Sequence, residues 1–227
     1  MPQKTVRRRT AETATNPPPT HPLHFKLYAI TDRGLCAPRT LYDTIHDLLD
    51  VGVSAIQLRE KDLSDAEYIK LAEPLCKLCH TYSAQLFINS RIEIAMSIGA
   101  DGLHLPGDSA SIEKVIEQTN GCFIIGSSVH TLTEAKQRET EGVDFITYSP
   151  IYPTLSKPDY GPAVGVEGLR NVVEGVNIPV FALGGITPER VSECLDAGAY
   201  GAAVMSGVMS PENGVQQAKV YLQQLSK

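Results

Sequence analysis

The chain has 227 residues, of which 42% are hydrophobic and 20% are charged, and its formal net charge at pH 7 is −6. This length and composition are typical of one globular α/β domain. A net negative chain lacks the basic face that nucleic-acid binding requires, and the sequence holds no run of about 18 apolar residues. We therefore expect neither a nucleic-acid partner nor a membrane partner.

Residues 1–24 differ in composition from the rest of the chain. Three arginines are followed by a proline-rich run, and the apolar stretch of a secretory signal is missing. Such a segment buries too little apolar surface to offset the loss of conformational entropy on folding. We therefore expect a disordered tail over residues 1–24 and a folded domain over residues 25–227. Five cysteines without an export signal point to a reducing, cytoplasmic location.

From residue 25 onward, short apolar runs alternate with amphipathic segments. The apolar runs predict strands over residues 27–31, 54–60, 85–89, 102–105, 123–128, 145–149, 179–185 and 201–206. The amphipathic segments predict helices over residues 41–51, 64–82, 91–99, 111–119, 131–142, 166–175, 187–198 and 212–225. Eight strand–helix pairs predict a single-domain (β/α)8 TIM barrel. An open doubly wound sheet fits the sequence less well. That fold usually has a G-x-G-x-x-G turn after its first strand, and the sequence there reads "TDRGLC".

The predicted helix over residues 64–82 contains "CKLCH", which matches the haem-attachment pattern C-x-x-C-H. That chemistry needs export to an oxidising compartment, and no export route is evident. Apolar residues at positions 71, 75 and 78 have the spacing of a buried helical stripe. We therefore expect Cys76 and Cys79 to be core residues.

Small residues end the last two predicted strands. In a (β/α)8 barrel the active site lies at the carboxyl ends of the strands, and the turns after strands seven and eight commonly hold a phosphate. Uncovered backbone N–H groups at a helix start favour an anion there, although glycine also serves ordinary tight turns. The sequence therefore predicts a phosphate site at Gly184, Gly185, Ser206 and Gly207.

A second group of polar residues is predicted at the same end of the barrel. Gln57, Arg59 and Lys61 alternate along the second strand and so face one side, where burial would be costly without a ligand. Further polar residues end other strands or lie in the loop after strand six. The whole set predicts a site for a second anion, a diphosphate or a carboxylate: Gln57, Arg59, Lys61, Asn89, Ser128, Thr154, Ser156 and Lys157.

Five strings, "QLREK", "IGSSVH", "PIYPTLSK", "GGITPER" and "AVMSG", occur in an order and spacing that resemble the thiamin phosphate synthase/TenI superfamily. The resemblance covers residues 27–225 and implies a (β/α)8 barrel that binds phosphorylated thiazoles. In the synthase branch, it also implies a pyrimidine diphosphate whose leaving group is held by Mg²⁺ on two aspartates. Here "INSR" and "HLPGDS" put Ser90 and Ser109 at those two positions, with Asp108 one residue early.

The loss of two carboxylates favours the TenI-like branch, whose members aromatise a carboxythiazole phosphate by a proton shift without a metal. His130 matches the histidine that this branch is thought to use, and imidazole can take and return a proton near neutral pH. His104 is the second candidate and is expected to be structural. We therefore expect a thiazole tautomerase, an isomerase that binds a phosphorylated thiazole and needs no cofactor.

Two alternatives stay open. The first is thiamin phosphate synthase, a transferase with Mg²⁺ held through Asp108, which the synthase-like strings "QLREK" and "PTLSK" favour. The second is a non-catalytic sensor of thiazole or thiamin phosphates. Because barrels of this size often pair, a homodimer is also expected.

Overall fold

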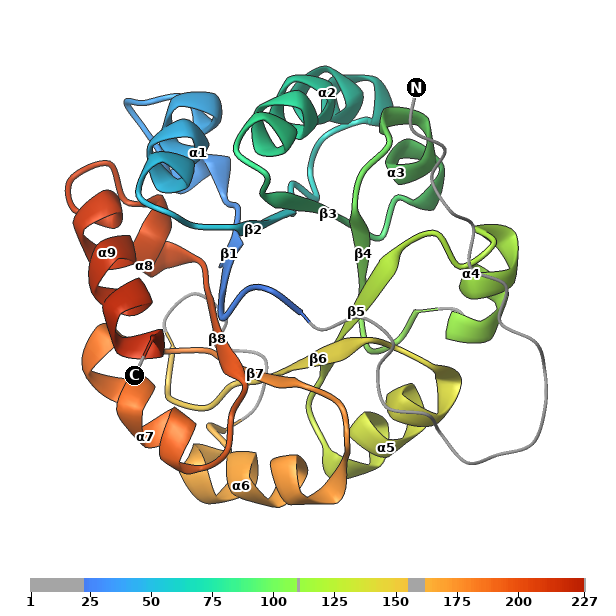
Figure 1. Cartoon of the computed structure of the whole chain (residues 1–227), viewed down its shortest axis with the longest axis vertical. Helices are drawn as coiled ribbons and strands as arrows, with labels where there is room; N and C mark the ends of the chain where they lie inside the picture. The colour runs from blue at the N-terminus through green and yellow to red at the C-terminus, as the bar shows by residue number, and fades with distance from the viewer. Residues whose placement is uncertain (1–22, 110, 155–161, 227) are drawn as a thin grey trace.

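Eight parallel strands close on themselves in chain order, so the computed structural model is a (β/α)8 barrel as predicted (Figure 1). It describes residues 23–109, 111–154 and 162–226. β1 closes the barrel by pairing through Ala29 with Ile56 of β2 and with Val204 of β8. The strands are β1 (Leu27–Ile30), β2 (Ala55–Leu58), β3 (Gln85–Asn89), β4 (Gly102–Leu105), β5 (Ile124–Val129), β6 (Phe145–Tyr148), β7 (Val180–Leu183) and β8 (Gly201–Val204).

The helices form an outer ring around the strands (Figure 1). They are α1 (Leu41–Asp50), α2 (Asp65–Thr81), α3 (Ile92–Ile98), α4 (Ile112–Gln118), α5 (Leu132–Glu141), α6 (Gly165–Gly175), α7 (Val191–Asp196), α8 (Ser206–Met209) and α9 (Gly214–Leu225). The short α8 is not predicted, because four residues are too few to show a helical period. Two 3-10 turns, Arg33–Leu35 and Pro188–Arg190, precede α1 and α7.

Aromatic side chains fill the amino-terminal end of the barrel interior. The ring of Phe25 lies 5.3 Å from that of Phe181 and 5.6 Å from that of Phe87, measured between centroids. Glycines on neighbouring strands make room for these rings: a Cβ on Gly102 would lie 2.3 Å from Phe87, and one on Gly126 would lie 2.3 Å from Phe145. This layer packs one end of the barrel interior, and the cavity described below lies at the other end, where the strands finish.

The folded domain begins slightly earlier than predicted. Leu23 is buried, and its carbonyl accepts a hydrogen bond of 2.5 Å from the Tyr200 hydroxyl. The rest of the expected tail, residues 1–22, lies outside the described residues. The packed part of the chain therefore includes residue 23.

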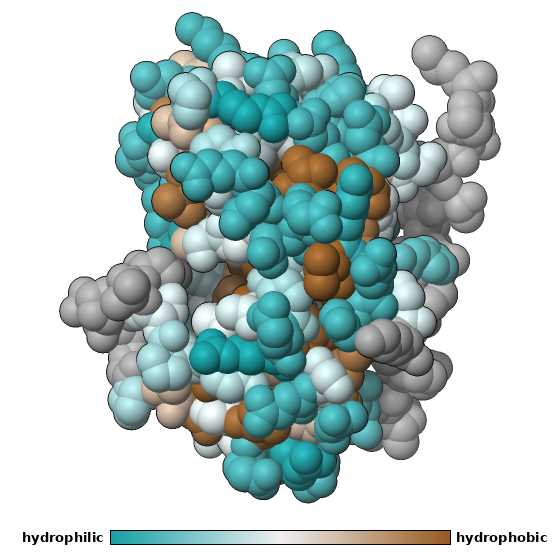
Figure 2. Space-filling model, turned by 90° about the vertical axis from the view of Figure 1, so that its left-hand side faces the viewer, coloured by the Kyte–Doolittle hydropathy of each residue, from teal (hydrophilic) through white to brown (hydrophobic). Residues whose placement is uncertain are grey.

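Hydrophilic side chains cover most of the face shown in Figure 2, with small apolar patches between them. This agrees with amphipathic helices that turn their apolar side to the barrel. No helix within residues 23–109, 111–154 and 162–226 is long and apolar enough to cross a membrane.

Candidate active site

A cavity of about 470 Å³ opens at the carboxyl ends of the strands. Residues from all eight strands or from the loops that follow them line it, as the barrel predicts. It brings together most of the predicted site residues: Gln57, Arg59, Lys61, Asn89, Asp108, Ser128, His130, Thr154, Gly184, Gly185 and Ser206. Gly207 lines an adjoining cavity of about 680 Å³ instead. Ser156 and Lys157 lie outside the described residues.

The turn after β7 has the backbone geometry of a glycine pair. Gly184 and Gly185 have φ angles of +94° and +65°. The Gly184 carbonyl accepts from the Tyr152 amide at 3.0 Å, and the Gly185 carbonyl accepts from Arg190 Nη1 at 2.6 Å. The Arg190 guanidinium also stacks on the Tyr152 ring at 4.3 Å from its centroid. These bonds fix both carbonyls, so this turn is held rigidly beside Ser206 at the cavity wall.

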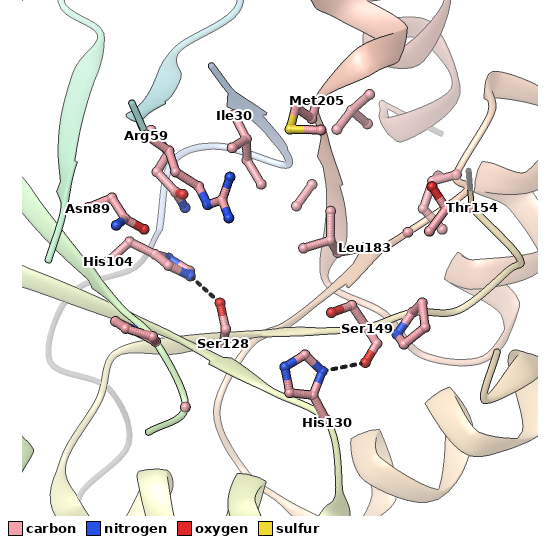
Figure 3. A pocket seen from close by; sticks show the side chains of 18 of the residues that line it. Ile30, Arg59, Asn89, His104, Ser128, His130, Ser149, Thr154, Leu183 and Met205 are labelled. Carbon is pink, nitrogen blue, oxygen red and sulfur yellow. Dashed lines mark hydrogen bonds between the residues drawn. The ribbon is translucent and has the colours of Figure 1, made fainter. Parts of the chain in front are cut away.

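The cationic residues lie on the opposite wall. Figure 3 shows Arg59 and Asn89 across the cavity from Thr154 and Leu183. Gln57 lies deeper and is buried, with Nε2 at 3.3 Å from the Tyr28 hydroxyl. The cavity thus has a cationic wall and, facing it, a wall of backbone turns.

His104 is buried and lines the cavity. Its Nε2 lies 3.0 Å from Ser128 Oγ, and its Nδ1 lies 3.4 Å from the Tyr28 hydroxyl (Figure 3). Burial, and then the nearby charge of Arg59, lower the pKa of His104 to about 3. The ring is therefore neutral near pH 7 and orients the Ser128 hydroxyl, which agrees with a structural role.

His130 is held with its ring at the cavity. Nδ1 lies 2.8 Å from the Ser149 carbonyl oxygen, which can only accept, so Nδ1 carries the proton and Nε2 is the basic nitrogen (Figure 3). The backbone N–H of His130 donates to Glu134 Oε2 at 2.6 Å. Glu134 also lines the cavity and was missed from the sequence. The pattern "TLTE" at residues 131–134 is that of a capping box, in which the Glu134 carboxylate would accept from the Thr131 backbone N–H. The Thr131 hydroxyl does accept from the Glu134 N–H, but the carboxylate accepts from the His130 N–H instead.

Two acidic residues, Asp108 and Glu134, line the cavity along the described chain, and neither Ser90 nor Ser109 does so. Mg²⁺ is commonly held by one or two carboxylates together with substrate phosphates. Asp108 and the Asn89 amide both line the cavity, and their oxygens are donors that fit an ion shared with a bound diphosphate.

The sequence matches the family described as "Thiamine monophosphate synthase" over residues 27–208. It is 48% identical over 181 residues to "Putative thiamine-phosphate synthase 2" of Aquifex aeolicus, covering 80% of this chain and 96% of that protein. It is 36% identical to "Thiamine-phosphate synthase" of Clostridium acetobutylicum, covering 89% and 96%. A solved thiamine phosphate pyrophosphorylase from Pyrococcus furiosus superposes with a TM-score of 0.81 at 34% identity, covering 89% and 96%.

The family match spans the barrel from β1 into α8 and includes every strand end that lines the cavity. The relatives are covered almost from end to end, so the similarity is not limited to a shared barrel. The chain therefore belongs to the thiamine monophosphate synthase/TenI family.

Proposed function

We propose that this protein is a thiamine-phosphate synthase, which joins a pyrimidine diphosphate to a thiazole phosphate. The observation that carries this proposal is one cavity lined by the cations Arg59 and Lys61 and, elsewhere, by the backbone turns at Gly184, Gly185 and Ser206, so that it has two walls suited to an anion. A condensation of two phosphorylated substrates needs two such walls. The names of the relatives support the same transferase rather than the isomerase expected from the sequence.

In this reaction the C–O bond between the pyrimidine methylene and the diphosphate breaks, and its electron pair leaves with the diphosphate. The thiazole nitrogen supplies the electron pair of the new C–N bond. Arg59 and Lys61 would stabilise the charge that develops on the leaving group. The turn at Gly184 and Gly185, with Ser206, would hold the thiazole phosphate so that its ring nitrogen faces the methylene. When bound, Mg²⁺ would neutralise part of the diphosphate charge, with Asp108 and Asn89 as its protein ligands.

A thiazole tautomerase is the second candidate, and the geometry of His130 favours it. The Ser149 carbonyl fixes the tautomer in which Nε2 is the basic nitrogen, as a proton-transfer residue requires. In that reaction, the cationic wall would hold the substrate carboxylate. The retained anion walls would also serve a sensor that binds without turnover.

One experiment separates these functions. The purified protein is given aromatic thiazole phosphate, pyrimidine diphosphate and Mg²⁺ in one tube, and the non-aromatic carboxythiazole phosphate alone in another. A synthase releases pyrophosphate in the first tube, loses this activity with chelator, and is impaired by Asp108→Asn. A tautomerase aromatises its substrate in the second tube despite chelator, and His130→Ala abolishes this.

Turnover in the second tube alone would overturn the synthase proposal. Binding of thiazole phosphate without turnover in either tube would leave the sensor. Homodimer formation and a cytoplasmic location stay predictions that size-exclusion chromatography and cell fractionation would test.

A further inference from the structure

Arg33 forms ion pairs with two carboxylates, Glu60 and Asp62, in the segment that follows β2. Its Nη1 donates to Glu60 Oε2 at 3.0 Å and to Asp62 Oδ1 at 2.6 Å, and Nη2 donates to Asp62 Oδ2. Its backbone N–H also lies 3.2 Å from Glu60 Oε1. Glu60 is only 4% exposed, which makes this an unusual place for a carboxylate without a specific role.

The same short segment carries the cationic wall of the cavity. Along residues 59–62, Arg59 and Lys61 line the cavity while Glu60 and Asp62 meet Arg33. The Thr31 hydroxyl joins the two sides: it donates to Glu60 Oε1 at 2.6 Å and accepts from the Arg59 backbone N–H at 2.9 Å. The position of Arg59 is thereby tied to the Glu60 carboxylate.

Four charges of alternating sign follow one another here, so the carboxylates can compete with a bound anion for the cations. Within the described ranges, Arg59 and Lys61 have no ion-pair partner, and both neighbouring carboxylates are bound to Arg33. The Arg33 guanidinium lowers the pKa of the Asp62 carboxyl to about 2 through its hydrogen bonds, so Asp62 is charged at any physiological pH. Without Arg33, that charge would be available to Lys61.

We propose that Arg33 is a positioning residue of the cationic wall. It binds Glu60 and Asp62, so that Arg59 and Lys61 stay available to a diphosphate. This inference rests on the proposed function for its ligand. It adds a residue that does not line the cavity and whose effect on binding passes through two carboxylates.

The test is calorimetric titration with inorganic pyrophosphate and Mg²⁺, alongside titration with thiazole phosphate. Arg33→Gln should weaken pyrophosphate binding about tenfold, because the freed carboxylates would pair with the cations and repel the anion. Thiazole phosphate affinity should stay within about twofold, because that ligand binds the opposite wall. The matched control is Arg39→Gln, which removes another half-exposed arginine that pairs with an aspartate, Asp47 at 2.6 Å, and should change neither affinity.

A second background separates charge competition from a folding effect. In Glu60→Gln/Asp62→Asn protein no carboxylate is left to compete or to be buried unpaired, so adding Arg33→Gln should change pyrophosphate affinity less than about twofold. A tenfold loss in that background, or no loss from Arg33→Gln in the wild-type background, overturns the inference while the proposed function stands. If the wild-type protein does not bind pyrophosphate, then the cationic wall is not a diphosphate site, and both that assignment and this inference are wrong.

Discussion

Replacing Gly185 by alanine tests most directly whether the wall of backbone turns holds the thiazole phosphate. Gly185 has a φ angle of +65°, a left-handed conformation that costs an alanine about 1–2 kcal/mol. A Cβ at this position would also lie 2.8 Å from Tyr152 Cβ and 2.9 Å from the Pro153 carbonyl oxygen. Because both neighbours belong to the loop after β6, that loop must move, which adds about 1–3 kcal/mol as overpacking does. We expect Gly185→Ala to lower the free energy of unfolding by about 2–5 kcal/mol.

Gly99 provides a matched control for this change. It ends α3 with a φ angle of +69°, and a Cβ there would meet nothing within 4 Å. Gly99→Ala should therefore cost only the conformational part, about 1–2 kcal/mol. The difference between the two variants isolates the close contact between the turn after β7 and the loop after β6.

Urea denaturation gives both unfolding free energies, and calorimetry gives the affinity for thiazole phosphate. Gly185→Ala should bind the ligand at least about tenfold more weakly, because the backbone N–H groups move with the turn. Gly99→Ala should bind it as the wild type does. Equal losses of stability in the two variants, together with unchanged affinity in both, would refute the reasoning.

Three further predictions follow from other contacts. His104 has a pKa of about 3 when folded and about 6.5 when unfolded, so its contribution to stability is present above pH 6.5 and is lost as the pH falls toward 3. Between pH 7 and pH 5, urea denaturation should show that the wild type loses about 2 kcal/mol more than His104→Gln, and equal losses would contradict the burial argument. Arg190→Lys should weaken thiazole phosphate binding about tenfold but leave pyrophosphate binding unchanged, because lysine cannot both stack on Tyr152 and hold the Gly185 carbonyl. The control is Arg170→Gln, which removes another arginine that donates to a backbone carbonyl. A thiol reagent should label Cys122 quickly and Cys79 only after unfolding, because Cys122 is exposed while burial raises the pKa of Cys79 to about 12; rapid labelling of Cys79 would reopen a redox role for "CKLCH".

The barrel was predictable because strand and helix periods differ and each strand is short and apolar. The predicted strand over residues 85–89 matches β3 at both ends, and the one over 102–105 matches β4. Predicted strands that ran too far, such as 54–60, included polar residues beyond the last ladder partner, Leu58. Arg59 and Lys61 line the cavity while Glu60 and Asp62 bind Arg33, so the alternation along β2 continues for a few residues past its end.

The residues that were missed act through contacts that no sequence period reveals. Arg33 follows β1 but binds carboxylates that follow β2, and Glu134 reaches back past its expected capping partner to His130. The first contact joins residues of two different loops, and the second joins a helix residue to a residue that precedes the helix. Periodicity assigns a residue to a face of its own element and says nothing of which neighbouring loop it meets.

Asp108 shows why the choice between the two enzymes was harder to predict than the fold. In a strand, a shift of one residue would turn a side chain to the opposite face, and the sequence alone does not show whether this holds for a carboxylate that stands one position early. Asp108, however, follows Leu105, the last residue of β4, by three positions and lies in a loop, where successive side chains do not alternate. A loop carboxylate displaced by one residue can therefore reach the same cavity, and Asp108 does line it. Within a strand, the position of a residue in a family motif therefore predicts which way its side chain points. In the loop after β4 it does not, and the orientation of Asp108 has to be taken from the structure.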